Sequence, residues 1–349
     1  MASTVLVLGI ETSCDETAAA IVDNKKNIVA NVVFSQILEH AKYNGVVPEI
    51  AARMHIKNIE MIVNQAMTNA KIDYKQLDAV AATSGPGLIG CLMVGLMTAK
   101  GIALATNKPF IAINHLEGHI LTPILTNNIE FPYFMLLMSG GHCQILVVKS
   151  LGNYIKIGET LDDSVGEAFD KVAKMLKLNY PGGPIIENRA LLGKSDSIKL
   201  PRPLIKQNNH NFSFSGLKTA VKRIVDKTDI TIEQNVNNIC ASFQEAVKDI
   251  FVVKLDKLLP MLKINYPAAK YLVVSGGVAS NKQLRKSISN VALQHNLKFA
   301  APPVAMCTDN AAMIAWAGVE RAKIGQFSNI NHAPQARWPI DSPDIQITN

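Results

Sequence analysis

Several patterns that define common protein classes are missing from this chain of 349 residues. The five cysteines are an odd number and form no Cys-x-x-Cys pair, which argues for reduced thiols rather than a disulfide framework or a metal cluster. The longest apolar region, 88–105, is interrupted by three glycines and Lys100, so we interpret it as a buried helix rather than a membrane span. The apolar strand pattern begins at about Thr4, so we expect no secretory or transit segment and a cytoplasmic protein.

The two best-known nucleotide-binding patterns are also missing. The chain contains neither Gly-x-x-x-x-Gly-Lys-Ser/Thr nor the three-glycine dinucleotide fingerprint. Glycine-rich turns are present instead, at Gly85-Pro86-Gly87, Gly140-Gly141, Gly182-Gly183 and Gly276-Gly277. Glycine lets a backbone approach phosphate or ribose closely, and a following helix offers unpaired N–H groups. Each turn alone could be a tight turn and no more, but the four together indicate one bound nucleotide.

The formal net charge of +7 favours a polyanionic partner such as nucleic acid. A basic protein without such a partner is equally consistent with charge alone. The stretch that contains Lys206, Lys218, Lys222 and Arg223 could meet RNA phosphates or form an ordinary solvated face.

A strand rhythm occurs twice along the chain and is the main clue to the architecture. The expected strands are 5–10, 18–22 and 28–34 in the first half, then 134–138, 144–148 and 154–158 in the second. Helical patterns follow each set, which predicts an α/β protein of two similar lobes with a nucleotide and metal cleft between them. This is the actin-like (ASKHA), sugar-kinase-like fold class. One large doubly wound sheet is the alternative, but it would leave the repeat unexplained.

The predicted pair of lobes gives the expected domain boundaries. We expect an N-terminal lobe at 4–110, a C-terminal lobe with helical insertions at 111–309, and a tail at 326–349. A helix at about 310–325, introduced by Asp309, could pack back on the first lobe. We also expect a helix from 236 that stops before Pro260, a strand at 271–274, and a capping box of Ser280 and Gln283 that starts the next helix.

Two imidazoles occur four residues apart in His115-Leu116-Glu117-Gly118-His119, so one helix face can present both to a metal ion. Glu117 lies about 200° around the helix from either histidine and would point away from that ion. The pattern therefore lacks the placed base of the His-Glu-x-x-His zinc proteases. Asp309 could complete a site that suits Fe²⁺ or Zn²⁺, or it could simply cap the following helix. A pair of partly exposed helix histidines is the alternative for the motif itself.

The turn 11–17 carries three acids and three hydroxyls between two expected strands. Carboxylates near phosphate act through a bridging cation or as proton acceptors, and Asp15 and Glu16 are our candidates. A solvated turn is the alternative. Asp170 could accept hydrogen bonds from ribose hydroxyls, or it could lie on an exposed helix surface.

Seven motifs occur together in this chain: 9–17 (GIETSCDET), 47–53 (VPEIAAR), 84–87 (SGPG), 115–119 (HLEGH), 139–142 (SGGH), 212–218 (FSFSGLK) and 307–310 (CTDN). In this combination and order the chain resembles the tRNA threonylcarbamoyltransferase family, over residues 5–338. It is similar to the bacterial-type branch, whose members were formerly called O-sialoglycoprotein endopeptidases.

The resemblance implies transfer of a threonylcarbamoyl group from threonylcarbamoyl-AMP to N6 of adenosine 37, next to the anticodon, in tRNAs that read codons beginning with A. AMP is released and N6-threonylcarbamoyladenosine (t6A) forms. The residues that match the family's adenylate-binding positions are Leu137, Met138, Ser139, Gly140, Gly141, Asp170, Gly183, Glu187 and Asn281. His115, His119 and Asp309 match its metal ligands, with one divalent ion, Fe²⁺ or Zn²⁺, per subunit. Asp15 and Glu16 lie on its catalytic first turn.

One position departs from the archaeal and eukaryotic relatives. These have a tyrosine metal ligand where this chain has Leu137, so a solvent or substrate oxygen must take that coordination place. His142, where they have asparagine, also favours the bacterial or organellar branch. The branch implies three partners: tRNA, a paralogous actin-like subunit (TsaB-type) and a small ATPase (TsaE-type), with no membrane. A metal-dependent glycoprotein endopeptidase and an actin-like ATP-dependent kinase or ATPase are the alternative functions.

Overall fold

The computed structural model describes residues 4–43 and 45–341, which form two compact units. Unit 1 comprises Met1–Asn128, Leu151–Tyr154 and Thr308–Asn349, and unit 2 comprises Ile129–Ser150 and Ile155–Cys307. The first boundary thus falls after residue 128 rather than at 110, because the helix that carries both histidines of the 115–119 motif packs with unit 1. The expected tail also belongs to unit 1, although its last part, 342–349, lies outside the described residues.

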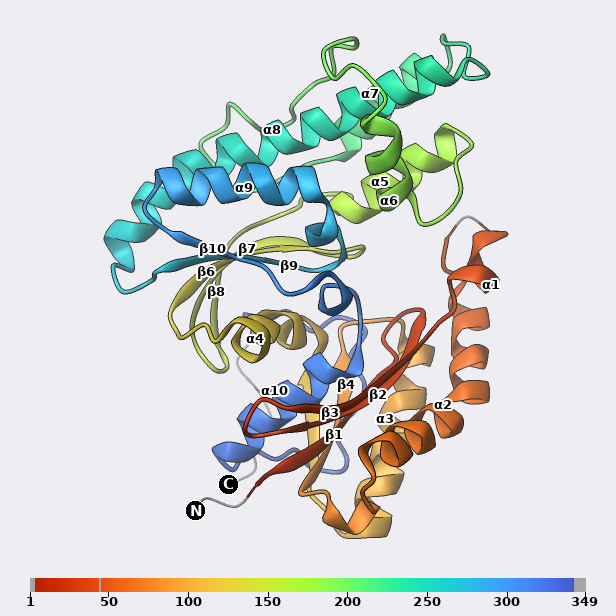
Figure 1. Cartoon of the computed structure of the whole chain (residues 1–349), viewed down its shortest axis with the longest axis vertical. Coiled ribbons are helices and arrows are strands. Elements are labelled where there is room, and N and C mark those ends of the chain that lie inside the picture. The colour runs from red at the N-terminus through yellow and green to blue at the C-terminus, as the bar shows by residue number, and fades with distance from the viewer. Residues whose placement is uncertain (1–3, 44, 342–349) are drawn as a thin grey trace. The chain divides into compact units, whose positions relative to one another are not determined.

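Unit 1 contains a five-stranded mixed β-sheet with helices packed against it (Figure 1). Its elements are β1 (Leu6–Glu11), β2 (Glu16–Asp23), β3 (Ile28–Ser35), α1 (Ile37–Ala41), α2 (Pro48–Ala70), η1 (Tyr74–Gln76), β4 (Ala79–Gly85), α3 (Ile89–Thr106), β5 (Phe110–Asn114), α4 (His115–Asn127) and α10 (Ala311–Lys323). The strand order is β3-β2-β1-β4-β5, with β1 antiparallel to β2 and parallel to β4. The three strands expected at the start of the chain are confirmed.

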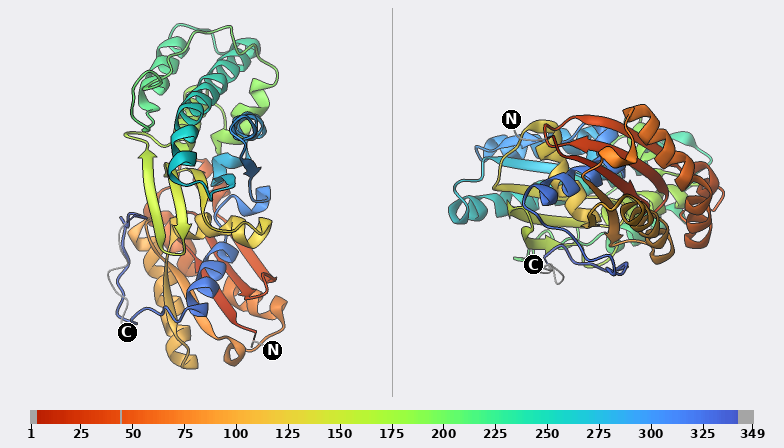
Figure 2. Two further views of the ribbon diagram at one scale, coloured as in Figure 1. Left: turned by 90° about the vertical axis from the view of Figure 1, so that its left-hand side faces the viewer. Right: turned by 90° about the horizontal axis from the view of Figure 1, so that it is seen from below.

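The two faces of β1 bury side chains against different helices. Leu8 and Ile10 belong to the apolar core that the sheet forms with α2 and α3. Gly9 faces the other way, toward α10, where an added Cβ would lie 2.3 Å from the backbone nitrogen of Ala315. Gly318 also lies close to the sheet, since its Cβ would be 2.8 Å from Cβ of Ala81 and 2.9 Å from Cγ1 of Val7. The expected return of this helix onto the first lobe is confirmed (Figure 2).

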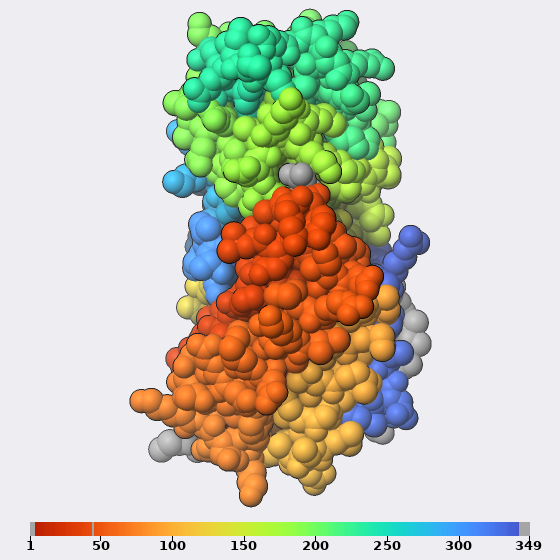
Figure 3. Space-filling view, turned by 90° about the vertical axis from the view of Figure 1, so that its right-hand side faces the viewer, coloured from red at the N-terminus to blue at the C-terminus, as the bar shows by residue number. Residues whose placement is uncertain are grey.

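Helix α3 differs from the buried helix expected at 88–105. The glycines do not interrupt it, and by length and composition it is the one helix of the described residues that could cross a membrane. It packs on α2 and β4, yet only 33% of its residues are buried. Its outward side carries the exposed Ile89, Met93, Met97 and Leu104. The space-filling view shows α2 and α3 on this face of unit 1 (Figure 3).

Unit 2 has its own sheet with the same strand order. Its elements are β6 (Tyr133–Met138), β7 (Cys143–Ser150), β8 (Asn153–Glu159), α5 (Val165–Met175), α6 (Gly182–Ala190), α7 (Ser215–Val225), α8 (Glu233–Asn265), β9 (Tyr271–Ser275), η2 (Gly277–Ser280), α9 (Lys282–Gln294), β10 (Lys298–Ala300) and η3 (Val304–Met306). The order β10-β9-β6-β7-β8 repeats unit 1, with the first strand antiparallel to the second and parallel to the fourth in both sheets. The predicted duplication is confirmed.

Two local predictions in unit 2 are wrong. Helix α8 continues through Pro260 to Asn265, because tertiary packing of its apolar side, including Leu258, Leu259 and Leu262, outweighs the lost hydrogen bond. Helix α9 is capped by Asn281, whose side chain accepts from the Leu284 N–H at 2.9 Å, and not by the Ser280–Gln283 capping box. The expected reduced thiols are confirmed, since all five cysteines are free and lie within the described residues.

Candidate active site

His115 and His119 share one side of α4 because they are four residues apart and both lie within the helix. The Asn114 side chain accepts a hydrogen bond from the Leu116 N–H at 2.9 Å and so caps the helix. His115 and His119 are then one turn apart, with ring centroids 4.9 Å from each other. Both are buried, at 7% and 0% exposure, so the alternative of a partly exposed histidine pair is wrong.

Asp309 joins these imidazoles and does not cap the helix that follows it. The cap is Asn310, whose side chain accepts from the Met313 N–H at 3.2 Å. Oδ1 of Asp309 lies 3.1 Å from Nε2 of His119 and 3.5 Å from Nε2 of His115. The three ligand atoms lie within 4.8 Å of one another. Two imidazole nitrogens and one carboxylate oxygen at this spacing fit a single divalent ion and leave further coordination positions open.

Glu11 supports this cluster from the end of β1. Its Oε2 lies 3.0 Å from Nδ1 of His115 and accepts from the Thr83 hydroxyl at 2.6 Å. Burial alone would raise the pKa of Glu11, but His115 lowers it below its ordinary value. Burial would likewise lower the pKa of His115, but Asp309 and Glu11 raise it to about 9. Glu11 therefore orients the ring so that Nε2 faces Asp309, as carboxylates behind metal-binding histidines do.

Glu11 is one of the three acids of the first turn, but it was not among the predicted site residues. Its position at the end of an apolar strand was the available signal, since it follows the buried Gly9 and Ile10 directly. The pattern could not show that Glu11 faces His115, because the two residues are 104 positions apart.

Asp15 and Glu16 lie in the same turn, and the two carboxyl groups have different properties. Asp15 is 7% exposed, and its backbone oxygen accepts from the Gln36 N–H at 3.0 Å. Burial and the neighbouring Asp15 carboxylate raise the pKa of Glu16 well above its ordinary value. Glu16 therefore releases its proton at a higher pH than an ordinary glutamate does.

Helices α2 and α3 hold this turn in place. The Thr12 hydroxyl donates to the Cys91 carbonyl at 2.8 Å and accepts from the Gly95 N–H at 3.1 Å. On the other side, His55 of α2 contacts the turn twice, with Nε2 3.0 Å from the Cys14 carbonyl and Nδ1 2.8 Å from the Thr17 hydroxyl. His55 is another residue that the sequence analysis missed, and a lone histidine on a helix offered no signal for its role.

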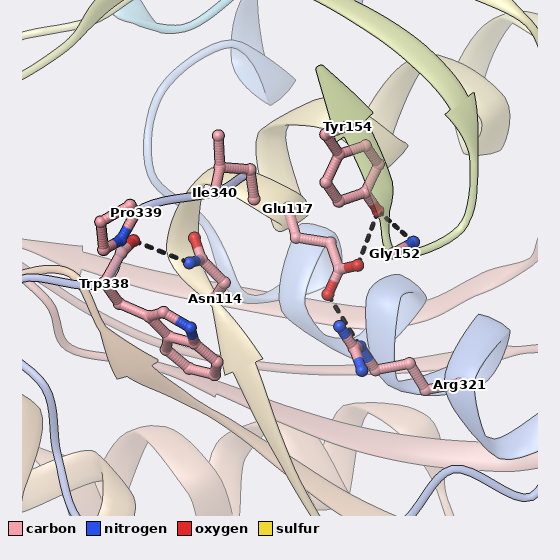
Figure 4. A pocket seen from close by; sticks show the side chains of 8 residues that line it. All are labelled: Asn114, Glu117, Gly152, Tyr154, Arg321, Trp338, Pro339 and Ile340. Carbon is pink, nitrogen blue, oxygen red and sulfur yellow. Dashed lines mark hydrogen bonds and ion pairs between the residues drawn. The ribbon is translucent and has the colours of Figure 1, made fainter. Parts of the chain in front are cut away.

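Glu117 points away from the histidine cluster, as predicted. Its carboxylate accepts from Nε of Arg321 at 2.8 Å and from the Tyr154 hydroxyl at 2.6 Å (Figure 4). Asn114 and Trp338 line the same small pocket, where the Asn114 amide donates to the Trp338 carbonyl at 3.0 Å. The carboxylate is thus held by a guanidinium and a phenol, and it does not point toward the cluster of His115, His119 and Asp309.

In unit 2, the residues 137–141 expected at an adenylate form the end of β6 and the turn after it. Leu137 and Met138 have fully buried side chains, so only their backbone could meet a ligand. Ser139 closes the turn, with its N–H donating to the His142 carbonyl at 2.7 Å. Gly276, at φ +92°, lies beside this turn, because a Cβ there would be 2.4 Å from the Met138 carbonyl.

The remaining candidates of unit 2 are connected through α6. The Asp170 carboxylate accepts from the Gly182 N–H at 2.7 Å, which places it at the helix start next to Gly183. Further along α6, Glu187 accepts from the Lys282 N–H at 2.7 Å, directly after Asn281. The structure therefore places Asp170 beside Gly183 at the start of α6, and Glu187 beside Asn281 at the start of α9. The exposed-surface alternative for Asp170 is wrong, since the residue is half-buried and bonded to α6.

The basic stretch is partly neutralised within unit 2. Lys218 pairs with Asp163, and Lys222 lies 3.2 Å from Asp226 on an exposed side of α7. Lys206 and Arg223 are exposed. A continuous basic face is therefore not formed by these four residues, and their contact with RNA stays a prediction.

Comparison with solved structures defines the class of protein. The chain aligns with the HypF protein of T. kodakarensis over 92% of its own length and 48% of that chain, with a TM-score of 0.61 and 13% identity. It aligns with a ROK family glucokinase from Streptomyces griseus, determined with glucose and AMPPNP, over 92% of its length and all of that chain, with a TM-score of 0.50 and 12% identity. At such identities the likeness concerns the fold alone. The chain is an actin-like, sugar-kinase-like α/β protein.

Sequence comparison gives the family. The family model of TsaD, tRNA N6-adenosine threonylcarbamoyltransferase, matches residues 27–316. The enzyme of that name from Brucella suis is 52% identical over 347 residues, which is 98% of this chain and 97% of the relative. The one from Bartonella bacilliformis is 51% identical over 352 residues, with the same coverage. The chain belongs to the TsaD family and forms t6A in tRNA.

Proposed function

We propose that this chain transfers the threonylcarbamoyl group from threonylcarbamoyl-AMP to N6 of adenosine 37 with the help of one divalent metal ion. The observation that supports the proposal is the cluster of two buried histidines, His115 and His119, with the half-buried Asp309. Glu11 contacts His115 of this cluster from the end of β1. A donor that is already a mixed anhydride needs no enzyme-bound intermediate. The protein then has to bind AMP, stabilise developing charge and align the attacking amine.

The metal ligands in this proposal are His115, His119 and Asp309, and the ion is Fe²⁺ or Zn²⁺. Two nitrogen donors and one oxygen donor suit either ion. When bound, the ion supplies positive charge that polarises the carbamoyl carbonyl or neutralises the leaving phosphate. Glu11 fixes the orientation of one ligand ring in either case.

The adenylate is assigned to unit 2. The nucleotide would lie against the backbone of the 139–141 turn, where glycines allow close approach. The backbone of Leu137 and Met138, just before the turn, would contact it as well. Asp170, which accepts from the Gly182 N–H at the start of α6, would also accept from the ribose hydroxyls. Gly183, Glu187 and Asn281 would complete the site at the starts of α6 and α9, where helix N-termini favour negative charge.

Asp15 is the proposed proton acceptor. The adenine amine attacks the carbamoyl carbon, the bond from that carbon to the phosphate oxygen breaks, and AMP leaves with the electron pair. The proton of the amine passes to the Asp15 carboxylate. An exocyclic amine is a weak nucleophile because its lone pair is delocalised, so removal of this proton during attack lowers the barrier. The raised pKa of Glu16 favours its protonated form, which cannot accept this proton, so Asp15 is proposed instead.

The proposal includes a cytoplasmic location and three macromolecular partners. The substrate is tRNA, and a paralogous actin-like subunit (TsaB-type) and a small ATPase (TsaE-type) complete the active assembly. The assembly, rather than the isolated chain, is therefore the form in which activity should be measured.

The deciding experiment supplies the assembly with unmodified tRNA and threonylcarbamoyl-AMP and detects t6A by mass spectrometry of the digested tRNA. We expect t6A and an equal amount of AMP, and loss of both with His119→Ala. Cleavage of a sialoglycoprotein, or phosphate release from ATP by this chain, without t6A would favour the endopeptidase or the kinase instead. Formation of t6A at the normal rate after complete removal of metal by a chelator would contradict the metal's role.

A further inference from the structure

Glu117 and Arg321 form a buried ion pair that the proposed reaction does not use. Glu117 is fully buried and Arg321 is 7% exposed, and their Oε2 and Nε atoms lie 2.8 Å apart. Two charges removed from water are costly unless each is paired and hydrogen-bonded. The Tyr154 hydroxyl supplies a further hydrogen bond to the same carboxylate, at 2.6 Å (Figure 4).

The ion pair connects α4, which carries both histidines of the proposed metal site, with α10, which begins just after Asp309. Glu117 lies in the first turn of α4, between the two histidines, and Arg321 lies in the last turn of α10. Asp309 immediately precedes the Asn310 cap of that same helix. Asp309 and Arg321 are twelve positions apart, about 18 Å along a helix, so Arg321 acts at a distance from the cluster.

The first turn of α4 is therefore contacted on two opposite sides. His115 and His119 face Asp309, and Glu117, about 200° around the helix axis, faces Arg321. Between these contacts the helices lie close together, because a Cβ at Gly118 would be 3.0 Å from Ile314 and 3.1 Å from Met313. A rotation of α4 about its axis would move both imidazoles relative to Asp309, and it would also break the ion pair.

We propose that Glu117 and Arg321 are positioning residues, which set the rotation of α4 and with it the direction of both imidazoles toward Asp309. The inference rests on the proposed metal site and adds the device that keeps its geometry. Glu117 has no contact with the ion in this role. The ion pair holds both imidazoles in the orientation that binds the metal before the metal arrives. Metal binding then requires little rearrangement of these side chains.

The test is metal affinity, measured with Zn²⁺ on the purified full chain by competition with a chromogenic chelator. Glu117→Gln keeps the size of the side chain but leaves Arg321 without its counter-charge. We expect affinity to fall by about tenfold, the smaller loss found when the orientation of ligating side chains is disturbed, because both imidazoles lose their direction toward Asp309. Arg321→Lys keeps the positive charge and should lose less. The visible spectrum of the Co²⁺-loaded protein should change in Glu117→Gln, because ligand orientation changes.

A matched control separates positioning from stability. Ile62→Ala removes a buried side chain of α2 from the opposite side of the same sheet and should lower the free energy of unfolding without changing Zn²⁺ affinity. A folded Glu117→Gln protein with wild-type affinity and an unchanged Co²⁺ spectrum would overturn the inference. If that variant does not fold, Tyr154→Phe, which removes one hydrogen bond to Glu117, decides by the same measurement.

Other results would contradict the proposed metal site itself. In that case the wild type would bind no stoichiometric Zn²⁺, or His119→Ala would bind it as the wild type does. Loss of binding in His119→Ala together with unchanged binding in both Glu117→Gln and Arg321→Lys would leave the metal site intact and contradict the positioning role alone.

Discussion

The Glu11 carboxylate lies 3.0 Å from Nδ1 of His115 and joins the end of β1 to the start of α4. The charge of Glu11 orients this imidazole and makes it more basic. Glu11→Gln removes that charge. We expect the affinity for Zn²⁺ to fall by about 10- to 100-fold, measured by chelator competition. Glu49→Gln is the control, because Glu49 pairs with Arg53 on an exposed surface of α2. Equal affinities of the Glu11 variant and the wild type would show that the contact does not support the site.

Asp15→Ala should spare adenylate binding and remove transfer. A positioned base contributes about 10²- to 10⁴-fold, so the single-turnover rate of t6A formation should fall by that order. Glu16→Gln should lose much less, since the raised pKa of Glu16 favours its neutral form and glutamine mimics that form. A normal single-turnover rate in Asp15→Ala would remove Asp15 from the proposed chemistry.

Gly9→Ala should destabilise unit 1, because the new methyl group would lie 2.3 Å from the Ala315 nitrogen and force α10 away from the sheet. Overpacking of this kind costs about 1–3 kcal/mol in the free energy of unfolding, which urea denaturation measures. Gly101→Ala in α3 is the control, since nothing lies within 4 Å of its Cβ position. That helix substitution should stabilise by up to about 1 kcal/mol. Equal stability of the two variants would contradict the close packing of α10.

Asp163 connects α5 and α7 through Lys171 and Lys218 and makes unit 2 sensitive to acid. Burial would raise the pKa of this carboxyl, but hydrogen bonds from Lys218 and Lys171 lower it below its ordinary value of 3.8. A lowered pKa in the folded state means that the stabilisation is present above pH 3.8 and is lost as the pH falls through the folded value.

Asp163→Asn should therefore be less stable than the wild type in urea unfolding at pH 7, and the difference should narrow in more acidic buffers. In a Lys218→Met background the same substitution should cost less, because one partner is already absent. A difference between wild type and variant that already narrows above pH 3.8, or that is absent at pH 7, would contradict the lowered pKa.

The fold could be predicted to a large extent because strand and helix patterns depend on local sequence. Strands β1 to β3 and β6 to β8 follow runs of apolar residues between turns, and their repetition indicated two units with the same topology. Predictions failed where tertiary packing outweighed a local rule. Pro260 does not end α8, because the buried leucines around it hold the helix in the core.

The site could be predicted in part. The four-residue spacing of His115 and His119 indicated a shared ligand face, and the same geometry indicated that Glu117 points elsewhere. The partner of Glu117 could not be predicted, because Arg321 is 204 residues away in the sequence. The choice between capping and ligation for Asp309 also needed the structure, in which Asn310 takes the cap.

The sequence by itself determined the family, the duplicated α/β organisation and the shared face of His115 and His119, since these depend on motif order, strand pattern and spacing. Only the tertiary structure decided which groups support them: Glu11 behind His115, His55 beneath the first turn, and Arg321 opposite Glu117. The physical reason is that a buried charge or imidazole takes its orientation and its pKa from the groups packed around it, and those groups are brought close by the fold across long separations in the chain.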